Sequence, residues 1–88
     1  MDEGKLRDEV ARGVQAEAIL RNPIFDEAFE TLLTHYNNEL LNSLPSEKEK
    51  REQCYYAINM LQKVQDEITS IMQTGKMASK ELGEDSLQ

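Results

Sequence analysis

Apolar residues recur at helical spacing in the second half of the chain. Ala57, Leu61, Val64, Ile68 and Ile71 follow one another at intervals of four, three, four and three residues. Such intervals place side chains on one side of an α-helix, and that side must then pack against other helices. The pattern therefore predicts one long helix over residues 47–74, with these five residues as its buried seam.

A second apolar stripe predicts a helix over residues 23–42. Asn22-Pro23 marks its start, because Asn is a favoured N-cap and Pro fits the first helical position. The stripe consists of Phe25, Phe29, Leu32, Leu33, Tyr36 and Leu40. A stripe of this width suits a helix that packs between two others. A weaker amphipathic pattern predicts a first helix over residues 6–20.

Local signals set the predicted ends of the long helix. Ser46 and Glu49 follow Pro45 with the spacing of a capping box, which predicts the helix start. Gly75 is placed as its C-terminal cap, with Lys76 complementing the negative end of the helix. Residues 1–75 are then a single helical domain, and residues 76–88 are predicted to form a flexible C-terminal tail.

The short connection between the two later helices predicts an antiparallel hairpin. The expected class is all-α, a three-helix arrangement built on a long antiparallel helical hairpin. Because the helices would be about 30 and 40 Å long, the far end of the longer one extends past its neighbour. Ile68, Ile71 and Met72 lie on this extension. Either the first helix or a second subunit covers them, and the sequence leaves both open. We predict a homo-oligomer with these three residues in its interface.

Composition and charge narrow the class of partner. The chain has 88 residues, a single Cys and a formal net charge of −7. It shows neither the basic and apolar regions of a secretory signal nor an apolar run of about 20 residues. We therefore expect a cytoplasmic protein without membrane contact. Asp26, Glu27 and Glu30 would repel phosphates from the second helix, so we expect no direct DNA binding by the isolated chain.

Candidate chemistry is sparse. Cys54 and His35 are a nucleophile and a base in principle, but no third residue is placed to orient them. Cys54 falls on the apolar side of the long helix and is expected to be a small core residue. One His and one Cys at unrelated positions do not give the ligand spacing of a zinc site. We predict no catalytic, cofactor or metal site, and no enzyme.

Tyr55 and Tyr56 flank the predicted seam on opposite sides, at about 120° and 140° from Leu61. Tyrosine offers a large contact area with a polar end and is enriched at protein interfaces. We therefore predict that both tyrosines serve a partner or subunit contact instead of the core of the protomer.

Three stretches carry a resemblance: residues 13–25 (GVQAEAILRNPIF), Arg51-Glu52, and residues 75–78 (GKMA). In this pattern the chain resembles short helical proteins of tailed bacteriophages. The hairpin is similar in outline to the oligomerising part of small terminase subunits. The resemblance implies a role in particle assembly or DNA packaging, phage or host proteins as partners, and a host-cytoplasmic or virion-associated location.

Two functions follow as hypotheses. The first is a non-enzymatic, self-associating helical protein of phage assembly or packaging. The alternative is a small acidic inhibitor, similar to a DNA mimic, that binds a basic site on a host protein, as the net charge of −7 suggests.

Overall fold

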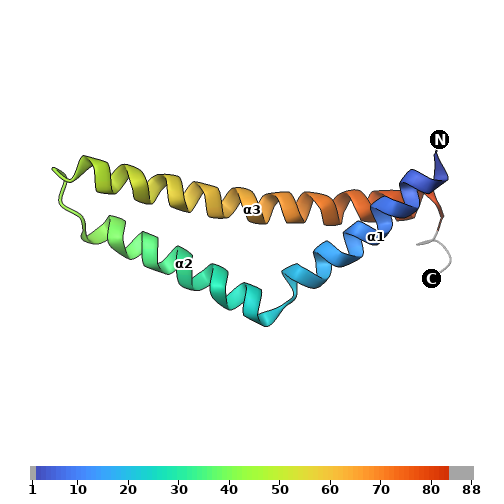
Figure 1. Ribbon diagram of the computed structural model, residues 1–88, viewed down its shortest axis with the longest axis horizontal. Coiled ribbons are helices and arrows are strands. Elements are labelled where there is room, and N and C mark those ends of the chain that lie inside the picture. Colours follow the sequence, from blue (N-terminus) through green and yellow to red (C-terminus); the bar gives the residue numbers. More distant parts are fainter. Residues whose placement is uncertain (1, 84–88) are drawn as a thin grey trace.

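The protein consists of three α-helices, α1 (Glu3–Leu20), α2 (Pro23–Asn42) and α3 (Lys48–Glu81). The computed structural model describes residues 2–83, and no strand occurs within that range. Figure 1 shows α2 and α3 joined by a short connection at one end of the molecule, while α1 returns to α3 at the other end. The predicted all-α class and its hairpin-based arrangement are therefore confirmed.

Side-chain caps fix the starts of the first two helices. Asn22 Oδ1 accepts the backbone N–H groups of Ile24 and Phe25 at 2.9 and 3.1 Å, so α2 begins where the sequence predicts. The carboxylate of Asp2 accepts the N–H of Gly4 at 2.9 Å. Because this cap satisfies amide groups that have no partner inside the helix, α1 begins three residues earlier than predicted.

The predicted capping box of Ser46 and Glu49 is wrong. The N-cap of α3 is Glu47, and no side chain caps the first amides of this helix. The carboxylate of Glu47 instead accepts the N–H of Leu44 at 2.7 Å, while its own N–H donates to the Leu44 carbonyl at 2.9 Å. These two bonds close the turn that contains Pro45 and Ser46, so α3 starts one residue later, at Lys48.

The predicted C-terminal cap is also wrong. The helix passes through Gly75 and Lys76 and ends at Glu81, so residues 76–81 of the predicted tail are helical. The glycine with left-handed backbone is Gly83, at φ 78°, directly after the C-cap Leu82. A glycine at this position is a common helix terminator. Residues 84–88 of the predicted tail lie outside the described residues.

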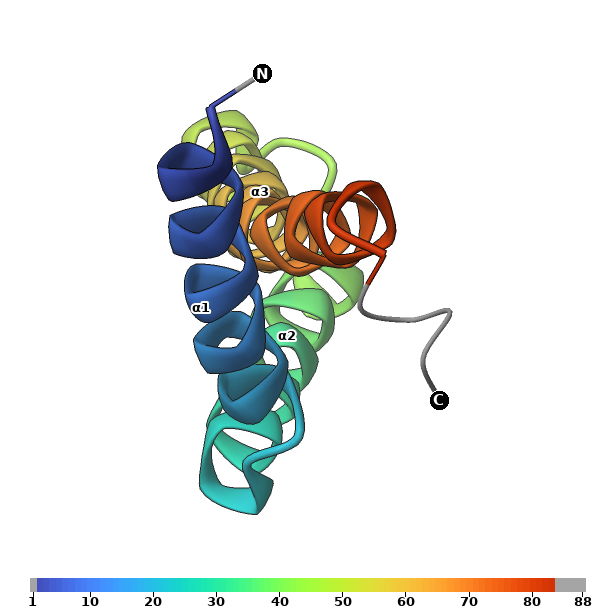
Figure 2. The ribbon, with the colours of Figure 1, turned by 90° about the vertical axis from the view of Figure 1, so that its right-hand side faces the viewer.

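The three helices enclose an open triangle. Figure 1 shows α3 along the whole length of the molecule and the corner between α1 and α2 well away from it. Viewed along the long axis, α1 lies beside α3 and α2 lies beneath it (Figure 2). Contacts between α1 and α3 are the most extensive, contacts between α2 and α3 come next, and α1 barely touches α2.

The resulting core is thin. The buried apolar residues of the described chain are Ala16, Phe29, Cys54 and Ala78, of which only Phe29 is large. The radius of gyration is 18.3 Å, against about 12 Å for a compact domain of this length. The protomer therefore leaves much of its apolar surface in contact with solvent.

Candidate interaction surface

Helices α1 and α3 cross at a pair of glycines. A Cβ atom built on Gly13 would lie 2.8 Å from the Cα of Gly75, and one built on Gly75 would lie 2.8 Å from the carbonyl oxygen of Glu9. Ala16 and Ala78, each three residues after one of the glycines, are buried beside this contact. The two backbones can approach this closely only because the side chains at the crossing are absent or small.

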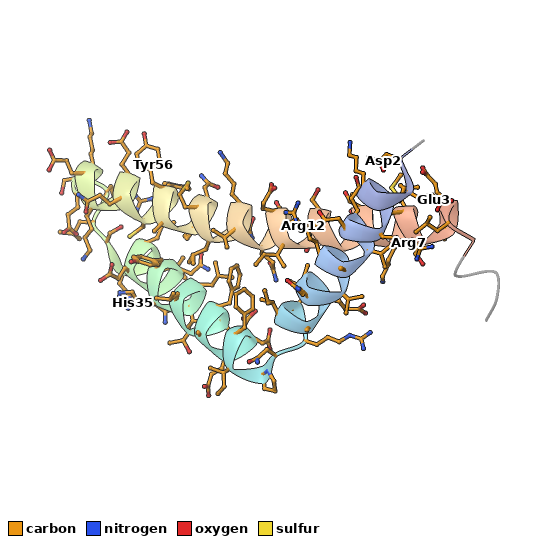
Figure 3. All side chains as sticks on the ribbon, turned by 45° about the vertical axis from the view of Figure 1, so that its right-hand side comes forward. Asp2, Glu3, Arg7, Arg12, His35 and Tyr56 are labelled. Atoms are coloured by element: carbon orange, nitrogen blue, oxygen red, sulfur yellow. The ribbon has the colours of Figure 1, made fainter. Side chains whose placement is uncertain are left out.

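This crossing covers the extension of the long helix with a helix of the same chain. Ile71 lines a hollow between α1 and α3 together with Glu9 and Arg12, and Figure 3 shows Arg12 at this junction. Met72 lines a second hollow with Val10 on the other side of the crossing. Ile68, Ile71 and Met72 are consequently half-buried in the protomer. Their predicted place in a subunit interface stays a prediction.

A hydrogen-bond network holds the opposite end of the molecule. The guanidinium of Arg51 donates to Ser43 Oγ at 2.8 Å and to the carbonyl of Leu40 at 3.3 Å. The Ser43 hydroxyl in turn donates to the same carbonyl at 2.6 Å. A side chain of α3 thus supplies hydrogen-bond donors to groups at the C-terminal end of α2. The network therefore fixes the orientation of the two helices next to their connection.

Cys54 is buried in the α2–α3 contact, as the sequence predicts for a core residue. Its Sγ lies 3.9 Å from Oε2 of Glu39, and the other oxygen of that carboxylate lies 3.6 Å from Nε2 of His35. The carboxylate thus lies between the thiol and the imidazole. In a nucleophile–base–acid triad the imidazole occupies the middle position, so this order differs from one that activates a nucleophile.

An exposed apolar groove lies between α2 and α3. We call it the α2–α3 groove. Its lining consists of Leu32, Tyr36, Ala57, Met60, Leu61 and Val64. Met60 is 58% exposed and Val64 is 50% exposed. Val64 therefore does not lie in the buried seam predicted for the long helix, whereas the other four residues of that seam are half-buried.

The adjacent tyrosines lie on different sides of α3. Tyr55 and Tyr56 are 54% and 64% exposed, so both lie outside the protomer core. Tyr55 borders a hollow with Pro45 and Lys48 near the connection to α2. Tyr56 lies on the side of α3 that faces away from α2 (Figure 3), one helical turn before Met60. Their role in a contact stays a prediction.

Sequence reasoning missed two features of this surface. The apolar spacing predicts Leu32 and Val64 in buried stripes, although they are 43% and 50% exposed. Gly75 was assigned to a helix cap, although it lies in the crossing. A usable signal existed, because Gly13 and Gly75 are each followed three residues later by an alanine. Residues three positions apart lie on the same side of a helix, and small side chains there let the backbone of another helix approach closely.

Chemical sites and similar proteins add little to this picture. Over residues 2–83, no group of three or more His, Cys, Asp or Glu side chains is arranged to hold a metal ion. None of the helices in that range combines the length and the apolar character needed to cross a membrane. No protein-family model, curated protein or solved structure matches the chain.

Proposed function

We propose that this chain is a non-enzymatic helical building block that acts by associating with copies of itself. The observation that supports the proposal is the open shape of the protomer. Its solvent-accessible surface is 6776 Å², whereas a compact monomer of 10.1 kDa exposes about 5,300 Å². Large apolar side chains are exposed on all three helices, among them Val14, Ile24 and Met60, as expected of one part of a larger assembly.

The biological setting of this proposal rests on the sequence resemblance. Short helical phage proteins of this pattern imply particle assembly or DNA packaging, and a self-associating protomer suits either role. Repeated copies of one interface build a larger symmetric structure from a short chain.

The experiment is a measurement of solution mass by light scattering over a range of micromolar concentrations. We expect a multiple of 10.1 kDa. An association driven by apolar burial should persist in molar salt, because screening weakens charge interactions and leaves apolar burial intact. A wild-type chain that remains monomeric at micromolar concentration contradicts the proposal.

The same measurement separates the second candidate, an acidic inhibitor of a basic protein. Asp26, Glu27 and Glu30 are all exposed on α2, and the chain carries a net charge of −7. Such an inhibitor would be a monomer in isolation, and its binding to a basic partner would weaken steeply as salt is added. A monomeric mass together with salt-sensitive binding of a basic protein therefore favours this candidate.

A further inference from the structure

We propose that the α2–α3 groove is the surface on which a second copy of this chain docks, with the groove of one protomer against the same groove of its partner. This inference rests on the proposed self-association and assigns it a location. Among the five residues predicted for a subunit interface, it retains only Tyr56, at the edge of the contact.

The first argument is the continuity of one side of α3. At the C-terminal end of the helix, α1 covers this side through Ile71 and Gly75. The same side continues toward the N-terminal end through Val64, Met60 and Ala57, which precede Ile71 by seven, eleven and fourteen residues. There the helix has no such cover, and Met60 and Val64 remain at least half exposed. Figure 1 shows α1 lying across only one end of α3.

The second argument is charge. Two copies of a chain with a net charge of −7 repel each other, so their contact is most favourable where ionised groups are absent. The six residues that line the groove include no carboxylate, ammonium or guanidinium group. An occupant that used charge for recognition would leave its own ions without partners there. A second copy brings an identical apolar surface, as a two-fold contact requires.

The third argument is area. The accessible surface of the protomer exceeds that of a compact monomer of its mass by about 1,500 Å². Each partner in an interface of standard size buries about 800 Å². One interface of standard size between two copies would therefore remove about half of this surplus per chain.

The test compares two methionines of α3. Met60 lies in the groove and is 58% exposed, whereas Met77 lies outside it and is 65% exposed. We expect Met60→Glu to weaken association at least about a hundredfold, because the interface would have to bury an unpaired carboxylate. Met77→Glu introduces the same charge on the same helix and should leave the solution mass unchanged. Circular dichroism should show equal helicity for both variants.

Each outcome bears on a separate claim. A monomeric wild type overturns the proposed function and this inference together. If the wild type is an oligomer and Met60→Glu has the same solution mass, the inference alone is overturned. The same holds if Met60→Glu and Met77→Glu dissociate equally.

If Met60→Glu loses its helical signal, cysteine variants decide. A short bis-maleimide should link two copies of Met60→Cys but not of Met77→Cys, with the wild type and its buried Cys54 as background. Equal linking of both variants overturns the groove as the docking surface.

Discussion

The backbones of α1 and α3 meet at Gly13 and Gly75. A Cβ atom built on Gly13 would lie 2.8 Å from the Cα of Gly75, and one built on Gly75 would lie 2.7 Å from the Cα of Gly13. The crossing is therefore closed to any residue larger than glycine unless the helices move apart. Because α1 touches α2 only slightly, this contact also determines where the first helix lies.

The crossing predicts the sign of the change in stability when either glycine is replaced by alanine. In an exposed helix, changing Gly to Ala stabilises by up to about 1 kcal/mol. At Gly13 the new methyl group would meet backbone atoms of α3, so we expect Gly13→Ala to destabilise the protein by about 1–3 kcal/mol. Gly75→Ala should act in the same direction. Urea unfolding followed by circular dichroism, at one fixed protein concentration, measures both.

The matched control for this prediction is the reverse change at Ala11, an exposed residue of α1. Ala11→Gly should cost about 1 kcal/mol through helix propensity alone. Removing a methyl group at Ala11 and adding one at Gly13, two residues further along, should therefore both destabilise the protein. A stabilised Gly13→Ala variant would show that the two helices do not cross at this contact.

The Arg51 network predicts coupling between two side chains. Arg51→Met should destabilise by about 1–3 kcal/mol and Ser43→Ala by about 1 kcal/mol, because each leaves polar groups near the end of α2 without a partner. Since the two residues share a hydrogen bond, the double variant should lose about 1 kcal/mol less than the sum. Thermal and urea unfolding of the four proteins provide the cycle.

Arg21 provides the control for this cycle. Its ion pair with Glu17 at 2.9 Å joins a largely exposed guanidinium to a neighbour on the same helix. Such a surface pair contributes at most about 1 kcal/mol, so Arg21→Met should have little effect. Equal losses at Arg21 and Arg51, or strictly additive losses at Ser43 and Arg51, would argue against the network.

The cap at Asn22 predicts that stability depends on whether the side chain at this position can accept a hydrogen bond. Asn22→Ala removes the acceptor for the N–H groups of Ile24 and Phe25 and should destabilise by about 1 kcal/mol. Asn22→Asp retains an acceptor at the same position and adds a negative charge at the positive end of α2, so it should be close to neutral. Unfolding midpoints of the three proteins test this order, and an Asp variant as unstable as the Ala variant would contradict it.

The two tyrosines predict a separation between folding and association. Tyr55 and Tyr56 are each more than half exposed, so each change to Ala should alter the free energy of unfolding of the protomer by less than about 0.5 kcal/mol. The double variant should keep its helicity and associate more weakly. Because Tyr56 lies one helical turn before Met60 of the α2–α3 groove, its single change should account for most of that loss. A double variant that unfolds would place the tyrosines in the core.

Much of the fold follows from short-range features of the sequence. Asn22-Pro23 determines the start of α2, because the cap and the fixed backbone angle of proline act within three residues. The intervals between apolar residues determine that all three elements are helices. The exposure of Tyr55 and Tyr56 follows from the same geometry, since both fall away from the side of α3 on which the apolar residues cluster.

The tertiary structure decided which of two similar glycines ends the last helix. Gly75 and Gly83 both follow helix-forming sequence, and local capping rules suit either of them. Gly75 stays helical because α1 packs against it, while Gly83 adopts the left-handed backbone of a terminator. The exposure of Val64 was decided in the same way. Apolar spacing shows that one side of a helix must be covered, but which residues face a neighbour depends on where that neighbour lies, and residues distant in sequence determine that position.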